Sequence, residues 1–251
     1  MQKIYKVGLA VMAALSLLYA FQGYYPDFIG VFSNAFSPLI SGVTVIVSGF
    51  SLERYWRESK GKFSMVWLYF TAGLFLWFMG EAVWAGYTLV LGVELPYPSA
   101  ADVFWLAGYV PFLIGLCWYV KLFSSALTWK RLTATLIAIF AFVVLAMALL
   151  VPPIFETEEN LITRTISLAY PILDFVLFGM AHLGLIIFWR GNIGKSWLLI
   201  NAAIATNACA DIIFSYTTAK GIYYNGHPAD LLFDFAYLFF LMAFYIHTKE
   251  L

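Results

Sequence analysis

The chain has 251 residues, of which 63% are hydrophobic and 20% aromatic, while only 11% are charged. Soluble domains are about 45–50% apolar and about 25% charged, so this composition excludes an ordinary soluble globule and indicates an integral membrane protein. The 14 basic and 14 acidic residues cancel, which excludes a strongly basic nucleic-acid binder, and Cys117 and Cys209, both inside apolar runs, exclude a disulfide-stapled secreted scaffold.

The apolar runs are long enough to cross a membrane, for which a helix needs roughly 20 mainly apolar residues. By this rule the sequence predicts eight transmembrane helices, over about residues 7–24, 28–50, 63–90, 102–123, 132–151, 165–189, 196–218 and 229–247. The stretches between them, such as Glu53–Lys62, Glu94–Asp102 and Pro152–Arg164, are too short for a soluble domain. The predicted fold is therefore all-α, a polytopic membrane helical bundle that forms a single domain over residues 1–251.

The basic residues predict the orientation of these helices. Lys3 and Lys6 precede the first run, as in a signal peptide, but no small-residue cleavage site follows, so we expect a retained helix. With both termini cytoplasmic, every lysine and arginine except Arg164 and Lys220 falls at the inner ends of the helices, as the positive-inside rule requires. We therefore expect a multi-pass protein of the cell membrane that contacts the lipid bilayer and no nucleic acid.

Matching residues recur at a nearly constant offset along the chain. Five matches share one order: Trp56-Arg57 with Trp189-Arg190, Gly61-Lys62 with Gly194-Lys195, Pro38 with Pro171, Glu81 with Asp211, and Asp102 and Tyr109 with Asp230 and Tyr237. The first three are 133 residues apart, and the others are 130 and 128 apart. This pattern predicts two parallel four-helix repeats, about residues 1–124 and 125–251, as in some transporters. The alternative is a generic four-span periodicity without duplication.

Carboxylates gather at one level of the predicted membrane. Those inside spans are Glu81, Asp174, Asp211 and Asp234. By helix rise they lie roughly 8 to 13 Å from the outer ends of their helices. Asp102 and Asp230 stand at the outer starts of the fourth and eighth helices, where a carboxylate stabilises a helix N-terminus. Ionisable groups inside a membrane are costly and mark a functional site by default.

No basic residue inside a span is placed to pair with these carboxylates. Each aspartate at a helix centre costs roughly 2.5–3.5 kcal/mol on insertion scales. The groups are therefore protonated, bound to a cation or reached by water. All three alternatives imply a cavity that opens outward.

Aromatic side chains share the level of the carboxylates, and an aromatic box around carboxylates suits an organic cation. The alternative is structural: tyrosine hydroxyls bond the carboxyl groups and hold helices together, at about 0.6 kcal/mol per contact. The predicted ligand- or ion-binding residues are Glu81, Asp102, Asp174, Asp211, Asp230, Asp234, Trp84, Tyr109, Tyr170 and Tyr237, with Tyr87, Trp105 and Tyr216 at the same depth. No catalytic residue is predicted, and the sequence identifies no cofactor or metal.

Three motifs resemble the membrane-embedded N-terminal region of many bacterial diguanylate cyclases and sensor kinases. They are Trp77-Phe-Met-Gly-Glu81-Ala-Val-Trp84, the turn from Pro96 through Asp102 to Tyr109, and Ala169-Tyr-Pro-Ile-Leu-Asp174, followed by Asp211 and by Asp230 to Tyr237. The resemblance runs from about residue 60 to the end, and it implies a shared sensory membrane module. In those relatives a cytoplasmic output domain follows the last helix, whereas this sequence ends at Leu251. We therefore expect an output partner in trans.

The leading functional hypothesis is a sensory or ligand-binding module that takes its ligand from outside and signals to a cytoplasmic or membrane partner. The internal repeat and the carboxylates also fit a cation- or proton-coupled transporter of small solutes. An accessory subunit of a membrane complex is the third hypothesis. An intramembrane enzyme ranks last because no histidine cluster accompanies the carboxylates, so we expect no enzymatic activity. Homo-oligomerisation is left open.

Overall fold

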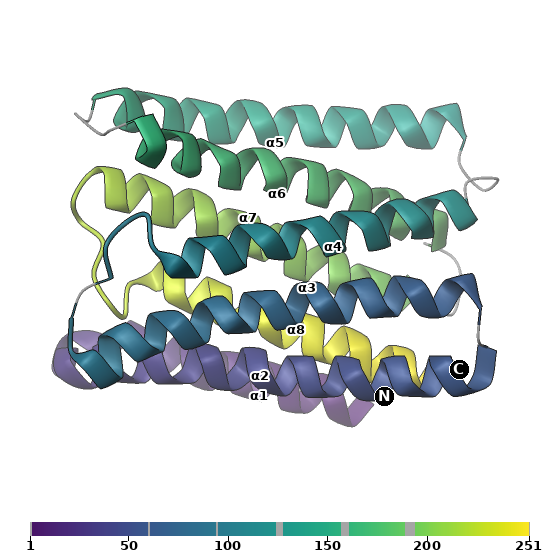
Figure 1. Cartoon of the computed structure of the whole chain (residues 1–251), viewed down its shortest axis with the longest axis horizontal. Helices are drawn as coiled ribbons and strands as arrows, with labels where there is room; N and C mark the ends of the chain where they lie inside the picture. Colours follow the sequence, from purple (N-terminus) through teal and green to yellow (C-terminus); the bar gives the residue numbers. More distant parts are fainter. Residues whose placement is uncertain are drawn as a thin grey trace.

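The computed structural model describes residues 2–59, 61–93, 95–123, 128–156, 161–188 and 194–250. Within these ranges every regular element is helical, and eight helices are long and apolar enough to span a membrane. This confirms the predicted all-α class and the number of apolar spans. In chain order the elements are α1 (Gln2–Ala20), η1 (Gln22–Tyr24), α2 (Pro26–Ser59), α3 (Lys62–Ala85), the π-helix η2 (Gly86–Leu91), α4 (Ala100–Leu122), α5 (Trp129–Glu156), α6 (Leu161–Phe188), α7 (Gly194–Ala219) and α8 (Pro228–Glu250) (Figure 1).

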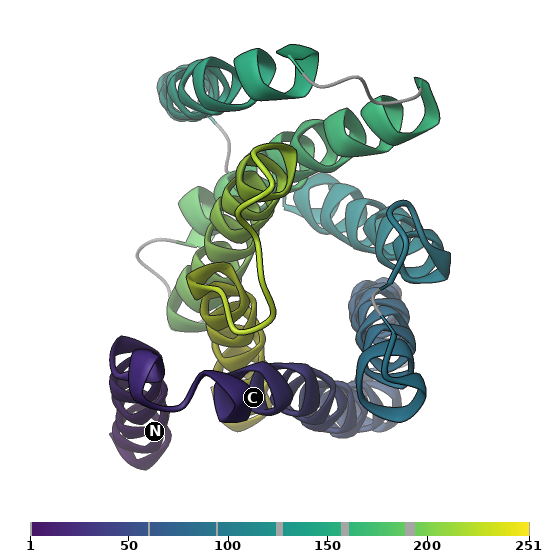
Figure 2. The ribbon, with the colours of Figure 1, turned by 90° about the vertical axis from the view of Figure 1, so that its left-hand side faces the viewer.

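Most of the helices form a ring. Neighbours pack in the order α2, α3, α4, α6, α7 and α8, and α8 closes the ring against α2. Figure 2 looks along the bundle and shows α1 outside the ring beside α8, and α5 outside it beside α6 and α7. Only 17% of the α1 span and 11% of the α5 span is buried, against 56% of the α8 span. The two outlying helices therefore leave most of their apolar surface for lipid.

The helices α2 and α5 continue beyond the predicted C-terminal ends of their spans. The polar stretch Glu53–Lys62, predicted as a connection, is helical as far as Ser59. Its Glu and Arg residues are good helix formers, and Arg57 donates to Glu53 one turn earlier. α5 likewise continues past Pro152 to Glu156. Hydropathy locates the part of a helix that lipid surrounds, whereas the helix itself ends where its backbone hydrogen bonds end.

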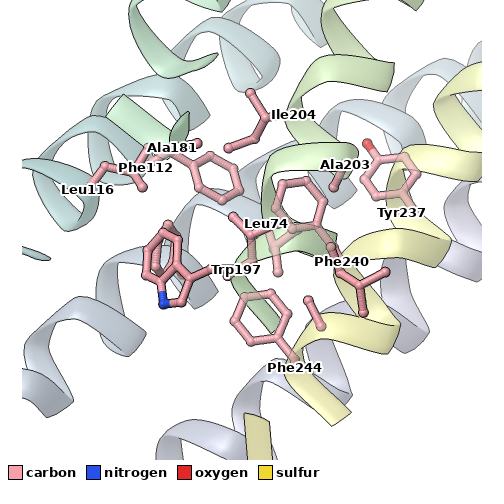
Figure 3. Close-up of a cluster of buried hydrophobic side chains, with 14 of the residues drawn as sticks. Leu74, Phe112, Leu116, Ala181, Trp197, Ala203, Ile204, Tyr237, Phe240 and Phe244 are labelled. Atoms are coloured by element: carbon pink, nitrogen blue, oxygen red, sulfur yellow. The ribbon is translucent and has the colours of Figure 1, made fainter. Parts of the chain in front are cut away.

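Large buried side chains fill one end of the ring. We call this set the core plug: Trp67, Phe70 and Leu74 of α3, Phe112 and Leu116 of α4, Trp197 of α7, and Phe240 and Phe244 of α8. All of them are fully buried, and Figure 3 shows several of them meeting between the ribbons. They lie away from the end at which α4 and α8 begin, which we call the mouth end. Apolar side chains of four helices therefore meet inside the ring, away from the mouth end.

Glycines allow α3 and α4 to approach closely. Rings of α4 cover two glycines of α3: Phe112 lies over Gly73 and Trp105 over Gly80. In return, Trp77 of α3 lies over Gly108 of α4 and donates its indole N–H to the Trp105 carbonyl at 3.0 Å. Small residues at helix contacts are the main way in which membrane helices gain close packing.

We expect Gly108→Ala to lower the stability of the protein by about 1–3 kcal/mol, because a Cβ there overlaps the Trp77 ring and overpacking has this cost. The matched control is Gly49→Ala on α2, where a Cβ meets nothing within 4 Å. Alanine is the better helix former, so Gly49→Ala should be neutral or slightly stabilising. Thermal unfolding of both variants in the same detergent measures the difference; equal melting temperatures would contradict the packing described.

Candidate functional site

A cavity of about 80 Å³ lies inside the ring at the mouth end. All six ring helices and the connection between α7 and α8 contribute side chains to it. The lining residues are Ser33, Asn34 and Ser37 of α2; Trp77, Glu81 and Trp84 of α3; Asp102, Trp105 and Tyr109 of α4; Tyr170 of α6; Asn207, Asp211 and Phe214 of α7; Tyr223 of the connection; and Asp230, Phe233 and Tyr237 of α8. It has room for several water molecules or for part of a small ligand.

Two carboxylates line the outer level of the cavity, each in the first turn of a helix. Asp102 forms a capping box with Ser99 at the start of α4, accepting from its backbone N–H at 2.6 Å. Its other oxygen accepts from the Tyr170 hydroxyl of α6 at 2.8 Å. Helix N-termini stabilise such carboxylates, as predicted for this position.

Asp230 occupies the corresponding place at the start of α8. It accepts from the Gly226 backbone N–H at 2.8 Å and from the Tyr223 hydroxyl at 2.9 Å. Gly226 has a φ of 90°, a conformation that a residue with a side chain rarely adopts. Burial and the neighbouring Asp230 raise the pKa of Tyr223 well above its usual range. Tyr223 therefore remains a protonated donor to this carboxylate.

Two further carboxylates line the deeper level. Glu81 of α3 accepts from the Tyr237 hydroxyl of α8 at 3.0 Å. Asp211 of α7 accepts from the Tyr109 hydroxyl of α4 at 3.3 Å and from the Asn207 amide at 2.7 Å. Each lining carboxylate thus receives a bond from a tyrosine elsewhere in the chain. These donors are neutral, so they place no positive charge beside the carboxyl groups.

Rings occupy the space between the two carboxylate levels. On α4 and α8, Trp105 and Phe233 each follow the outer aspartate by three residues, and on α3 and α7, Trp84 and Phe214 each follow the deeper carboxylate by three residues. The ring of Trp84 is 5.9 Å from that of Trp105 and 6.4 Å from that of Phe214, and Phe214 is 6.5 Å from Phe233. The four rings form one contiguous aromatic layer.

The structure places the sequence-predicted residues in two groups. Eight of them line the cavity: Glu81, Asp102, Asp211, Asp230, Trp84, Tyr109, Tyr170 and Tyr237. Asp174 and Asp234 are fully buried behind its wall. Asp174 accepts from Tyr109 at 2.7 Å and Asp234 from Ser37 at 2.8 Å, while the Oδ2 atom of each has no hydrogen-bond partner among the described residues. Of the residues at the same predicted depth, Trp105 lines the cavity, whereas Tyr87 and Tyr216 do not.

The sequence prediction missed the contribution of α2. Ser33, Asn34 and Ser37 line the cavity, and Asn34 accepts from the Trp84 indole N–H at 2.7 Å. The signal was present: Ser33, Ser37, Ser41, Thr44 and Ser48 recur every three or four residues, and all are buried. A polar stripe with helical spacing indicates a face turned toward protein rather than lipid. Tyr223, outside the predicted spans, carried no such signal.

The side chains that line the cavity suit an organic cation better than they suit a metal ion. Over the described part of the chain no lysine or arginine lines it. Nor do three His, Cys, Asp or Glu side chains in that part come together closely enough to hold a metal. The carboxylates are instead spread over four helices around aromatic walls. Such walls bind organic cations by cation–π attraction.

Comparisons of the chain with protein-family models, with curated proteins and with solved structures give no match. A shared helical architecture would in any case not determine function, which depends on the chemistry of the site.

Proposed function

We propose that this chain is a multi-pass sensory module of the cell membrane that binds a small organic cation from the outer side. The observation that carries the proposal is the cavity itself, where Glu81, Asp102, Asp211 and Asp230 meet aromatic walls and no described lysine or arginine. A cation that enters this cavity gains both charge attraction and contact with ring faces. We propose no catalytic role for these residues.

The proposed orientation has both termini in the cytoplasm and the mouth of the cavity outside. In Figure 1 both termini lie at the end of the bundle away from the starts of α4 and α8. Among the described basic residues, Lys3, Lys6, Lys130 and Lys249 lie toward that same end by their places in the helices. Lys60, Trp189 and Arg190, used in the sequence prediction, lie outside the described residues. The positive-inside rule supports this orientation.

We further propose that the two halves of the chain arose by duplication and run parallel in the membrane. A reciprocal pair of contacts supports this: Tyr109 of α4 donates to Asp211 of α7, and Tyr237 of α8 donates to Glu81 of α3. Exchange of the two predicted repeats converts one contact into the other. The ligand site would then lie on the local twofold axis, where both repeats contribute.

Signalling in this proposal passes through the ring. The tyrosine–carboxylate hydrogen bonds join α3 to α8, α4 to α7 and, through two bonds, α4 to α6. A bound cation therefore competes for carboxylate oxygens that hold helices together. A change in these bonds would shift the helix ends on the cytoplasmic side, where α2 continues to Ser59. The likeness to sensory regions of diguanylate cyclases and sensor kinases supports a partner in trans that reads this shift.

The test is a thermal-stability titration of the purified chain with a panel of organic cations, including choline, phenethylamine and spermidine. Ligand at 100 times its Kd stabilises a protein by about 2.7 kcal/mol, so at least one cation should raise the melting temperature saturably. Asp211→Asn should weaken the effect about tenfold or more. Asp27→Asn is the matched control, because Asp27 is exposed and lies outside the cavity lining. Failure of every cation in the panel to stabilise the wild type would overturn the proposal.

A further inference from the structure

We infer that the cavity is built for a linear polyamine, a flexible chain that carries two or more protonated amines separated by methylene segments. This inference rests on the proposed function and narrows its ligand class. It depends on the order of the lining side chains along the axis of the bundle, in which one pair of carboxylates lies nearer the mouth than the aromatic layer and the other pair lies deeper.

The two carboxylate levels are separated along the axis of the bundle. On α4, Asp102 lines the outer level, and Tyr109, seven residues further, bonds the deeper Asp211. On α8, Asp230 lines the outer level, and Tyr237, again seven residues further, bonds the deeper Glu81. Along each helix the Cα atoms of the two residues are therefore about 10 Å apart. An extended cation can therefore contact an outer and a deeper carboxylate at the same time.

The layer between the levels is apolar and aromatic. Trp105, Trp84, Phe214 and Phe233 form it, in that order, with successive ring centroids 5.9, 6.4 and 6.5 Å apart. A methylene segment packs against such rings without leaving a polar group unpaired. Ammonium groups at its two ends would then reach the outer and the deeper carboxylates, with ring faces beside them.

The charges of the cavity also favour a ligand with more than one positive charge. Four carboxylates line it, each bonded by a neutral tyrosine, and no described lysine or arginine offsets them. Behind the wall, the Oδ2 atoms of Asp174 and Asp234 are buried without a hydrogen-bond partner in the described part of the chain. A monoamine compensates one of these groups, and a polyamine compensates several. The donor set of a metal site is absent from the same residues, so compact divalent ions have no comparable site.

Isothermal titration of the full chain in nanodiscs tests the inference, with spermidine, putrescine, n-butylamine and Mg²⁺ as probes. We expect spermidine and putrescine to bind at least tenfold more tightly than butylamine, and Mg²⁺ to bind no more tightly than butylamine. Butylamine or Mg²⁺ binding as tightly as putrescine would overturn the inference, since a single charge or charge density alone would then account for binding. If butylamine, choline or phenethylamine binds well and the polyamines hold no advantage, the proposed organic-cation site stands without its polyamine specificity. If no cation of either panel binds, both proposals fail.

Two variants separate the levels. Asp230→Asn removes an outer charge and Glu81→Gln a deeper one, so each should weaken spermidine binding about tenfold or more. Butylamine, which reaches one level, should respond to only one of the two changes. Asp27→Asn should leave both affinities unchanged, and circular dichroism verifies folding of each variant. The comparison of probes on the wild type tests the inference even if a variant fails to fold. Equal loss of butylamine and spermidine affinity in both variants would contradict the two-level arrangement.

Discussion

Replacing Tyr109 by phenylalanine is expected to destabilise the protein by about 2–3 kcal/mol, because two buried carboxyl groups then lose the hydroxyl that donates hydrogen bonds to them. Tyr109 is 1% exposed, and it donates to Asp174 at 2.7 Å and lies 3.3 Å from Asp211. A buried polar group that loses its partner costs about 1–3 kcal/mol, and more if it is charged. The phenyl ring fills the same space, so the change isolates the hydrogen bonds from the packing.

Chemical or thermal unfolding in detergent measures this effect, and Tyr216→Phe is its control. Tyr216 lies on α7 and is 37% exposed, so loss of its hydroxyl should alter stability by less than about 0.5 kcal/mol. A double-mutant cycle with Asp174→Asn then assigns the energy. We expect a coupling of about 1–3 kcal/mol between Tyr109 and Asp174, as for residues in one hydrogen-bond network. Additive effects would mean that the bond contributes little.

The same bond illustrates what the sequence could and could not predict. Hydropathy and helix rise place the four span carboxylates at one depth, and the structure brings two of them, Glu81 and Asp211, to one cavity. They do not reveal which tyrosine meets which carboxylate. That pairing depends on the order of the helices in the ring, and nearly any apolar helix suits lipid or protein equally well.

The position of α5 outside the ring decides that order. Because α5 lies outside, α4 meets α6 directly, and Tyr170 reaches Asp102. One signal was available, since the α5 span has a mean hydropathy of 2.7 against 1.4–1.8 for the other spans. The α1 span, equally peripheral, has a hydropathy of 1.4 and gives no such warning. Composition therefore identifies some lipid-facing helices but does not order the ring.

The sequence spacing places each aromatic residue of the layer near a carboxylate, but it does not show that the four aromatic rings meet. Trp84 and Phe214 follow the deeper carboxylates by three residues, and Trp105 and Phe233 follow the outer ones by the same interval. Residues three apart share a helix face, so each ring had to lie near its carboxylate. Contact among the four aromatic side chains depends again on the order in which the helices are arranged around the bundle. Sequence thus predicts the contents of each helix face, and tertiary packing decides which faces meet.

The second large effect is expected at the core plug, where Trp197→Ala should destabilise the protein by about 3–5 kcal/mol. Trp197 is fully buried, its ring centroid is 3.9 Å from that of Tyr119, and its indole covers Gly184. In a membrane this loss comes from dispersion contacts and the empty volume, since lipid competes for apolar surface. The control is Trp129→Ala, which removes an indole that is 82% exposed and should change stability little. Comparable melting temperatures for the two variants would show that the plug is not packed as described.

The plug also separates the sensory proposal from transport. It fills the ring between the cavity and the opposite end, so a cation that binds at the mouth meets Phe240 and Trp197 rather than a path. A receptor with this packing should bind spermidine yet show no spermidine uptake above that of protein-free vesicles when reconstituted. A transporter has to part these side chains in each cycle, and alternating access requires a second state in which the cavity faces inward. Saturable uptake by the wild type, lost in Asp211→Asn and retained in Asp27→Asn, would therefore replace the sensory proposal with the transport alternative.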